Sequence, residues 1–185
     1  MPQIELSQGT VHYRDEGAGP PIVLIHGLLV NGRVWERLVP LLSTSSRVIV
    51  PDLPLGSHPQ AMKPSADLSP TGLAALIAEL IERLDLRDVT LVGNDTGGAL
   101  CQLVVTGHPE RLGRLVLVNC DAFEHFPPPP FKGVVKFLSR VPGSVAGLAA
   151  GARLGPIRRG AMSLAPPDRG PGPRRASEGL GVSIA

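Results

Sequence analysis

Four short, mostly apolar runs recur along the first two thirds of the chain, at residues 22–25, 47–50, 89–92 and 115–118. Each has the length of a strand and lacks the polar alternation of a half-exposed one, which predicts strands covered on both faces. Leucines recur at helical spacing between the runs, over residues 73–84 and 99–104. This alternation predicts an α/β fold, with a mostly parallel sheet and helices on both faces.

Local signals add further elements to this pattern. Residues 11–15 alternate and end in a Gly/Pro turn cluster, which predicts an edge hairpin strand. Large apolar residues recur at helical spacing after Asn31, a suitable N-cap, and Pro40 is expected to bend or end that helix. Ser69 followed by Pro70 predicts the start of a long helix.

Charge and composition divide the chain at a run of four prolines. Residues 1–126 hold 9 Lys+Arg and 14 Asp+Glu, whereas residues 127–185 hold 9 and 2. Gly plus Pro makes up 22 of the first 126 residues but 20 of the last 59. We therefore expect an α/β core over 1–126, a short helical segment over 127–165 and a disordered Gly/Pro/Arg-rich tail over 166–185.

Several classes of protein do not fit this sequence. There is no apolar run of membrane-spanning length and no secretory leader pattern at the N-terminus, so we expect a cytoplasmic chain without a membrane partner. Cys101 and Cys120 suit core positions and form no zinc or disulfide pattern, so no metal or cofactor is expected. No aromatic residue follows Phe137, which argues against nucleic-acid binding by the basic tail.

The chemistry is expected where the apolar runs end, because ligands of open parallel sheets bind beyond the carboxyl ends of the strands. His26-Gly27 follows the first run, Asp52 follows the second, and Gly93-Asn-Asp95-Thr-Gly97 follows the third. In the last segment, glycines stand two positions either side of one reactive side chain, between a strand and a helix. That is the layout of a nucleophile elbow. Over residues 10–126 the chain thus resembles the α/β-hydrolase family.

Because Asp95 holds the nucleophile position, the chain resembles the haloalkane dehalogenase and epoxide hydrolase branch of that family. The resemblance implies that Asp95 attacks a small organic substrate and forms an ester, which water then hydrolyses. It also implies that the backbone N–H groups of Leu28 and Thr96 form the oxyanion hole. His26, Gly27, Gly93, Gly97 and Asp52 receive supporting roles in the loops around the site. Asp121 matches an acid position of the dehalogenases, with an exposed loop carboxylate as the other interpretation.

The sequence also departs from this family. In the family, the water-activating histidine follows the last strand, whereas in this chain no histidine follows His125. Dehalogenases place a Trp after the nucleophile and epoxide hydrolases use a pair of tyrosines, but Thr96 follows Asp95 and the sole tyrosine is Tyr13. The resemblance therefore implies a family member shortened at its C-terminus, in which residues 127–165 begin a helical cap.

Two functions remain open at this point. The first is a hydrolase that acts on an ester, epoxide or haloalkane with Asp95 as nucleophile. The second is a catalytically incompetent remnant of the fold that at most binds a small apolar ligand. A phosphate loop over residues 93–98 is disfavoured, because no Lys-Ser/Thr follows the glycines and Asp95 would repel phosphate. A sheet that ends early also predicts self-association through its exposed edge.

Overall fold

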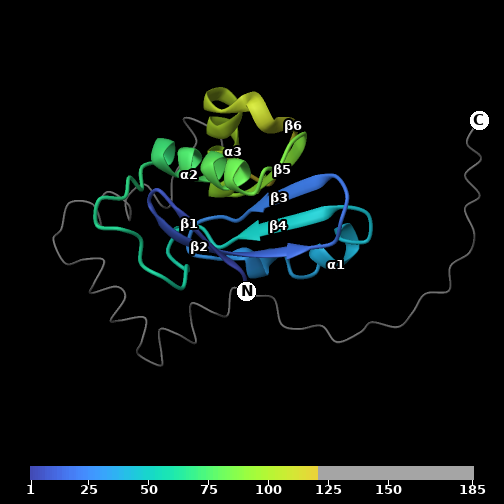
Figure 1. Ribbon diagram of the computed structural model, residues 1–185, viewed down its shortest axis with the longest axis horizontal. Helices are drawn as coiled ribbons and strands as arrows, with labels where there is room; N and C mark the ends of the chain where they lie inside the picture. The colour runs from blue at the N-terminus through green and yellow to red at the C-terminus, as the bar shows by residue number, and fades with distance from the viewer. Residues whose placement is uncertain (121–185) are drawn as a thin grey trace, which may run out of the picture. The chain divides into compact units, whose positions relative to one another are not determined.

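The computed structural model describes residues 1–120, and the expectations for residues 121–185, including Asp121 and the two C-terminal segments, lie outside the described residues. The strands are β1 Gln3–Leu6, β2 Gly9–Glu16, β3 Pro21–Ile25, β4 Arg47–Pro51, β5 Val89–Asn94 and β6 Leu112–Val118. The helices are α1 Val39–Leu42, α2 Pro70–Arg83 and α3 Thr96–Gly107, with short 3-10 turns η1 Gly32–Trp35 and η2 Pro109–Arg111 (Figure 1).

The strands form one sheet in the order β1-β2-β4-β3-β5-β6. β3 pairs in parallel with β4 and β5, and β5 pairs in parallel with β6, whereas β2 runs antiparallel to both of its neighbours. The predicted mostly parallel sheet is confirmed. Because β3, β4 and β5 run the same way, their carboxyl ends meet at one edge of the sheet.

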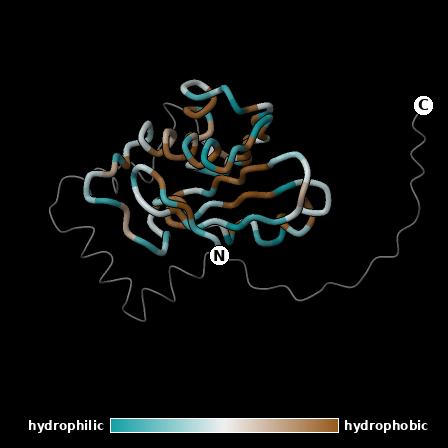
Figure 2. Tube along the Cα trace, viewed as in Figure 1, coloured by the Kyte–Doolittle hydropathy of each residue, from teal (hydrophilic) through white to brown (hydrophobic). Residues whose placement is uncertain are grey.

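The central strands are largely hydrophobic (Figure 2), and their alternate residues belong to two separate hydrophobic clusters. On one face, Ile25 and Leu91 pack in the cluster that contains residues of α2 and α3. On the other face, Leu24 and Val92 pack with Trp35 of η1 and Val39 of α1. The sheet is therefore covered by helical segments on both faces, and the apolar runs of the sequence are buried because they contribute to both clusters.

Three expectations about individual elements differ from the structure. Residues 11–15 lie in β2, which pairs with both β1 and β4, so the prediction of an edge strand is wrong. The single helix expected after Asn31 is two short pieces, η1 and α1, although Asn31 does cap η1 by accepting from the N–H of Arg33. Pro40 lies at the beginning of α1 rather than at a helix end, because its fixed φ suits a first turn.

The start of α2 follows the prediction closely. Ser69 is its N-cap and accepts a 3.2 Å hydrogen bond from the N–H of Gly72, and Pro70 is the first residue of the helix. The apolar stripe of α2, which includes Leu76 and Leu80, is fully buried against the sheet. The predicted helix is thus confirmed together with its cap.

The outermost described strand is more exposed than its sequence predicts. Val116, Leu117 and Val118 of β6 are 42%, 44% and 39% exposed, although a buried strand was expected. The reason is positional, since within residues 1–120 β6 pairs only with β5.

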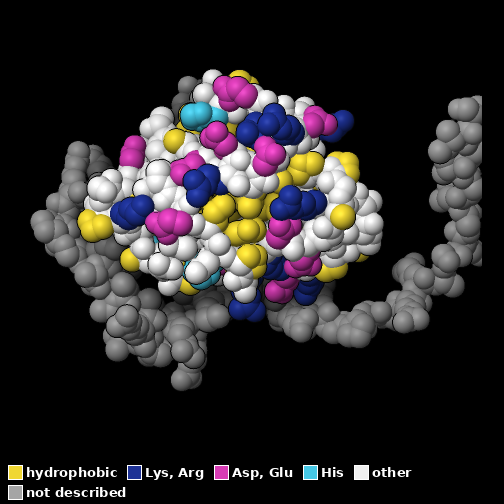
Figure 3. Space-filling view, in the orientation of Figure 1, with side chains coloured by type: hydrophobic (Ala, Val, Ile, Leu, Met, Phe, Trp, Pro, Cys, Tyr) yellow, Lys and Arg dark blue, Asp and Glu magenta, His cyan; other side chains and the backbone are white. Residues whose placement is uncertain are grey.

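On the face shown in Figure 3, acidic and basic side chains are interspersed around an apolar strip. In the described part of the chain, no helix combines the length and hydropathy that crossing a bilayer requires.

Candidate active site

Asp95 is the single residue between β5 and α3, and its backbone is strained. Its φ of 53° and ψ of −130° lie outside the conformations that L-amino acids commonly adopt. Its carbonyl oxygen accepts a 2.9 Å hydrogen bond from the N–H of Gly98 at the start of the helix. Such strain persists only where the surrounding structure enforces it. The chain therefore turns sharply from strand to helix at Asp95.

Two glycines allow the strands and the helix to approach one another at this turn. A Cβ on Gly93 would lie 2.6 Å from the carbonyl oxygen of Gly97. A Cβ on Gly97 would lie 2.6 Å from the carbonyl oxygen of Ile25 at the end of β3. Real Cβ atoms do not approach backbone oxygens so closely, so any side chain at these positions would push α3 away from the sheet.

The Asp95 side chain lies over Gly27. A Cβ on Gly27 would overlap Oδ2 of Asp95 and would lie 2.8 Å from its Cβ and 2.9 Å from its Cγ. As a whole residue, Asp95 is half-buried. The exits of β3 and β5 thus bring the His-Gly segment and the acidic side chain into direct contact.

His26 is fully buried and ties together the loops that follow β3 and β4. Its Nε2 accepts a 2.9 Å hydrogen bond from the N–H of Leu53. Because that N–H can only donate, the ring proton lies on Nδ1, which donates to the carbonyl oxygen of Gly27 at 2.8 Å. Burial lowers the pKa of His26 below the usual imidazole value. The histidine is therefore neutral and already has a hydrogen-bond partner at each ring nitrogen.

This arrangement fixes the direction of the Leu28 N–H group. The Gly27–Leu28 peptide is planar and trans, so its carbonyl and N–H point in opposite directions. Since the Gly27 carbonyl points at the buried ring of His26, the Leu28 N–H points away from it. Within residues 1–120, no acceptor bonds the N–H of Leu28 or of Thr96, which directly follows Asp95. Among the described residues, the N–H that follows the His-Gly segment and the N–H that follows Asp95 in the chain are thus both without an acceptor.

Asp52 orders the loop that follows the His-Gly segment. Its Oδ1 accepts a 2.8 Å hydrogen bond from the N–H of Gly32, the first residue of η1. Arg14 of β2 donates to the carbonyl oxygen of the same glycine at 2.7 Å. Asp52 therefore lies beside the site rather than in it, at the exit of β4.

Other residues singled out from the sequence are not brought to Asp95. Within the described residues, no histidine is hydrogen-bonded to its carboxylate. His12 lies 3.4 Å from Gln60, and His108 follows the far end of α3. The Nδ2 of Asn94 donates to the carbonyl oxygen of Val118 at 3.0 Å, which holds the end of β6 beside the turn. Asp121 follows shortly after that point and lies outside the described residues.

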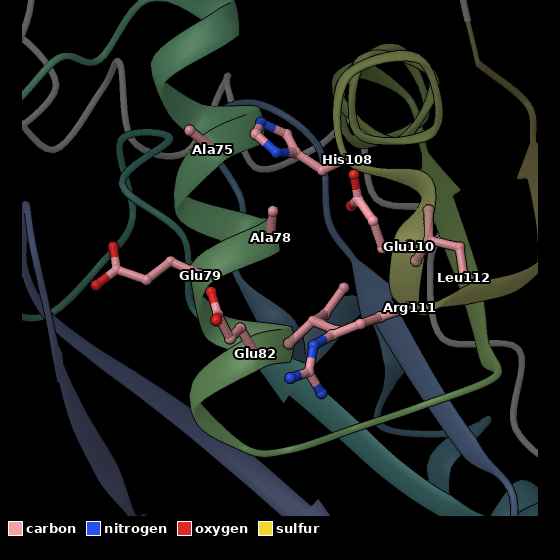
Figure 4. Close-up of a pocket in the computed structure, with 9 residues that line it drawn as sticks. Ala75, Ala78, Glu79, Glu82, His108, Glu110, Arg111 and Leu112 are labelled. Atoms are coloured by element: carbon pink, nitrogen blue, oxygen red, sulfur yellow. The ribbon is translucent and has the colours of Figure 1, made fainter.

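A pocket of about 340 Å³ lies between α2 and the connection from α3 to β6 (Figure 4). Its lining includes Ala78 and Glu82 of α2 and His108, Glu110 and Arg111 of the connection, whereas the Glu79 side chain points to the other side of α2. Arg111 is already bonded to Asp85 at 2.9 Å. The pocket lies at the amino ends of β5 and β6, at the opposite edge of the sheet from Asp95, so it forms no part of the candidate site.

Sequence reasoning missed two features around the turn. Leu29 has a φ of 62°, and its N–H donates to the carbonyl oxygen of Leu55 at 2.8 Å. No pattern in the run Leu28-Leu29-Val30 signals that conformation. Cys120 was assigned only a core role, yet its Sγ would lie 2.7 Å from a Cβ on Gly98. The close packing of α3 against the end of β6 needs both a small residue and a glycine, which no local pattern reveals.

Known proteins are similar to this chain in sequence and in fold. The chain matches the sequence profile of the family described as "alpha/beta hydrolase fold" over residues 20–155. An uncharacterized protein of Mycobacterium tuberculosis is 38% identical over 115 residues, which cover 60% of this chain and 33% of that protein. A haloalkane dehalogenase of Mycolicibacterium paratuberculosis is 37% identical over 114 residues, which cover 59% of this chain and 37% of that protein.

Solved structures extend the same likeness to three dimensions. An esterase from Exiguobacterium antarcticum superposes with a TM-score of 0.57 at 27% identity, covering 64% of this chain and 44% of the esterase. Relatives and structures alike are longer than the segment they share with this chain. The chain spans between a third and a half of the length of these three proteins.

Proposed function

Because this chain belongs to the alpha/beta hydrolase fold family, we propose that Asp95 is the nucleophile of a hydrolase acting on small organic molecules through an alkyl ester. The observation that carries the proposal is a half-buried carboxylate at a strained strand-to-helix turn, lying directly over Gly27. A carboxylate suits displacement at an alkyl carbon, because it is a stable anion at neutral pH and forms an ester when it attacks.

In the first step, one carboxylate oxygen of Asp95 attacks an electrophilic carbon of the substrate. A carbon–oxygen bond forms, and the bond to the leaving group breaks with its electron pair. A haloalkane releases a halide ion, whereas an epoxide opens to an alkoxide that takes a proton from water. The protein retains the alkyl group as an ester of Asp95.

The free N–H groups of Leu28 and Thr96 support both steps in this proposal. During attack they orient the carboxylate oxygen that does not react. When water later adds to the ester carbonyl, the same oxygen becomes a full oxyanion, and donors already in place stabilise it without reorganisation. Their position next to the turn and next to the His-Gly segment is what favours a two-donor site.

The second step lacks an evident base in the described residues. The sequence contains His12, His26, His58, His108 and His125. Of these, His26 is bonded at both ring nitrogens, and His12 and His108 lie away from the turn. His58 is half-buried and its Nδ1 has no hydrogen-bond partner, so it makes no bond through that atom to Asp95, and His125 lies outside the described residues. Because no histidine within residues 1–120 is hydrogen-bonded to the Asp95 carboxylate, we expect the alkyl ester to accumulate on this chain.

Among substrate classes, haloalkanes are favoured. Two proteins similar to this chain are named haloalkane dehalogenases, from Mycolicibacterium paratuberculosis and Mesorhizobium japonicum. Epoxides and esters remain the other candidates, since a putative epoxide hydrolase and an esterase share the fold. The chain's own residues support displacement at an alkyl carbon over acyl transfer, because attack of a carboxylate on an ester carbonyl would yield a mixed anhydride.

Intact-mass spectrometry tests the proposal directly. The chain is incubated with a panel of primary haloalkanes, epoxides and alkyl esters, and we expect one alkyl group per chain on the peptide containing Asp95. Asp95→Asn and Asp95→Ala should remove the adduct. Asp88→Asn is the matched control, because Asp88 is an exposed aspartate with a φ of 51° away from the site. An adduct that persists in the Asp95 variants would contradict the proposal.

A non-catalytic role has one supporting observation. Leu28, Leu29 and Val30 are 47%, 74% and 38% exposed next to the carboxylate, so an apolar ligand has a surface to contact. In that case a haloalkane would bind without forming an adduct. Ligand-induced chemical shifts at these residues with an unchanged intact mass would favour the binding role over the hydrolase.

A further inference from the structure

Leu29 has a backbone conformation that its side chain does not explain. Five non-glycine residues in the described chain have positive φ: Leu29, Asp85, Asp88, Asp95 and Asn119. Asp and Asn tolerate the left-handed region because their short polar side chains can bond locally, whereas a leucine has no such compensation. The Leu29 side chain is also 74% exposed, so burial does not hold it in place.

Backbone contacts hold Leu29 instead. Its N–H donates to the carbonyl oxygen of Leu55 at 2.8 Å, which joins the loop after β3 to the loop after β4. Next to Leu55, Gly56 has a φ of 107°, and a Cβ on it would lie 3.1 Å from Cδ2 of Leu29. We call these three residues, Leu29, Leu55 and Gly56, the Leu29 latch.

The latch completes the restraint on Leu28. The peptide before Leu28 is fixed because His26 donates to the Gly27 carbonyl oxygen. The peptide after Leu28 is fixed because the Leu29 N–H is bonded to Leu55. With both flanking peptides held, the direction of the Leu28 N–H is restricted, and the preceding residue, Gly27, is the one over which the Asp95 carboxylate lies.

We infer that Leu29 is a positioning residue, whose left-handed backbone keeps the Leu28 N–H aimed at the Asp95 carboxylate. The inference rests on the proposed role of Asp95, and it adds a residue that does not itself touch the reacting atoms. Because the chain after Leu29 is anchored where Asp52 accepts from the N–H of Gly32, a residue that relaxes to negative φ at position 29 must rotate the peptide before it, which would release the bond to Leu55. The donor would then be lost, while the apolar surroundings of the substrate would stay largely the same.

Substitutions at position 29 separate backbone from side chain. Leu29→Gly removes the side chain but adopts positive φ freely, so it should keep the rate of ester formation within about twofold. Leu29→Val keeps an apolar side chain but is β-branched and strongly disfavours positive φ, so it should slow that rate on the order of tenfold or more. The substrate concentration at half-maximal rate should change little. Leu41→Val is the control, because Leu41 is 70% exposed on α1.

A second measurement does not depend on activity. In 15N–1H spectra, Asp95→Asn should shift the Leu28 amide, because the substitution removes the neighbouring carboxylate charge; we call this shift the Leu28 response. The response should persist in Leu29→Gly and disappear in Leu29→Val. Should Leu29→Val fail to fold, as its spectrum would reveal, Leu29→Ala takes its place with a smaller loss.

The outcomes decide between the claims. Loss of the Leu28 response in Leu29→Val and its retention in Leu29→Gly support the positioning role. The positioning role is overturned if the Leu28 response is lost equally in both variants or is retained in both. It is also overturned if the unmodified chain shows no Leu28 response. If the unmodified chain forms no ester but its Leu28 amide follows Asp95 as expected, the proposed function fails while the positioning of the N–H group stands.

Discussion

Replacing Gly27 by alanine tests whether the Asp95 carboxylate lies where the structure places it. The new Cβ would overlap Oδ2 of Asp95 and lie 2.8 Å from its Cβ. Non-bonded carbon atoms prefer separations of about 3.5 Å or more, so one of the two groups must move by roughly 0.7 Å. The backbone of Gly27 is held by His26, and Asp95 is held by the end of β5, so neither group moves freely.

The expected effects follow from that displacement. Overpacking of this kind lowers the free energy of unfolding by about 1–3 kcal/mol. A reacting group misplaced by close to 1 Å loses on the order of 10²-fold in rate, so ester formation on Asp95 should fall by about that factor. The loss in rate should therefore exceed what the modest loss in stability explains, because the chain remains folded.

Urea unfolding and timed intact-mass measurements check both effects on the same preparation. Gly107→Ala is the matched control, because Gly107 lies at the end of α3 and a Cβ there would have no neighbour within 4 Å. That change should stabilise the chain by about 0.5–1 kcal/mol, as alanine favours a helix. The reasoning is refuted if Gly27→Ala behaves like Gly107→Ala, with neither stability nor ester formation reduced.

Three further predictions concern other contacts. Burial lowers the pKa of His26, so as the pH falls this residue is protonated in the unfolded chain before it is protonated in the folded chain. The free energy of unfolding should therefore be level above about pH 7. Below about pH 6.5 it should fall, by up to about 1.4 kcal/mol per pH unit. Urea unfolding should show no such slope for His26→Gln. Asp52→Ala should lower the free energy of unfolding by about 1–3 kcal/mol, because it leaves the N–H of Gly32 unpaired. Asp52→Asn should lower it less, because the amide oxygen of asparagine can still accept that hydrogen bond. Equal losses for the two variants in urea unfolding would contradict this. The exposed β6 strand should cause self-association, and Leu117→Lys should reduce it in light scattering; a monomeric unmodified chain would contradict this.

The sequence predicts the sheet well because its signals there are local. Each apolar run becomes a strand of the parallel part of the sheet, since consecutive Val, Ile and Leu residues both favour extended backbone and require burial on two faces. Ser69 and Pro70 predict the start of α2 for the same reason, as cap and first turn involve only neighbouring residues. The glycines around Asp95 likewise predict a close approach between the strand and the helix from the sequence alone.

The remaining features depend on partners distant in the sequence. Residues 11–15 alternate like an edge strand, but β1 covers their outer side, and alternation alone does not reveal a second neighbour. Exposure of β6 follows from its place at the end of the described sheet rather than from its composition. Leu29, which has positive φ, is hydrogen-bonded to Leu55 from a different loop, and that partner leaves no trace in the residues around position 29.

The two residues of the site with positive φ, Leu29 and Asp95, follow strands whose last apolar residues are buried in the core. Ile25, which directly precedes His26, is fully buried, and Val92 near the end of β5 is 7% exposed. A strained backbone residue costs about 1–3 kcal/mol, whereas one fully buried aliphatic side chain contributes about 1.5–3 kcal/mol. The packing of a few such side chains therefore suffices to hold both Leu29 and Asp95. It follows that weakening the core beneath these exits, as in Ile25→Ala, should relax the site and slow ester formation while the chain is still folded.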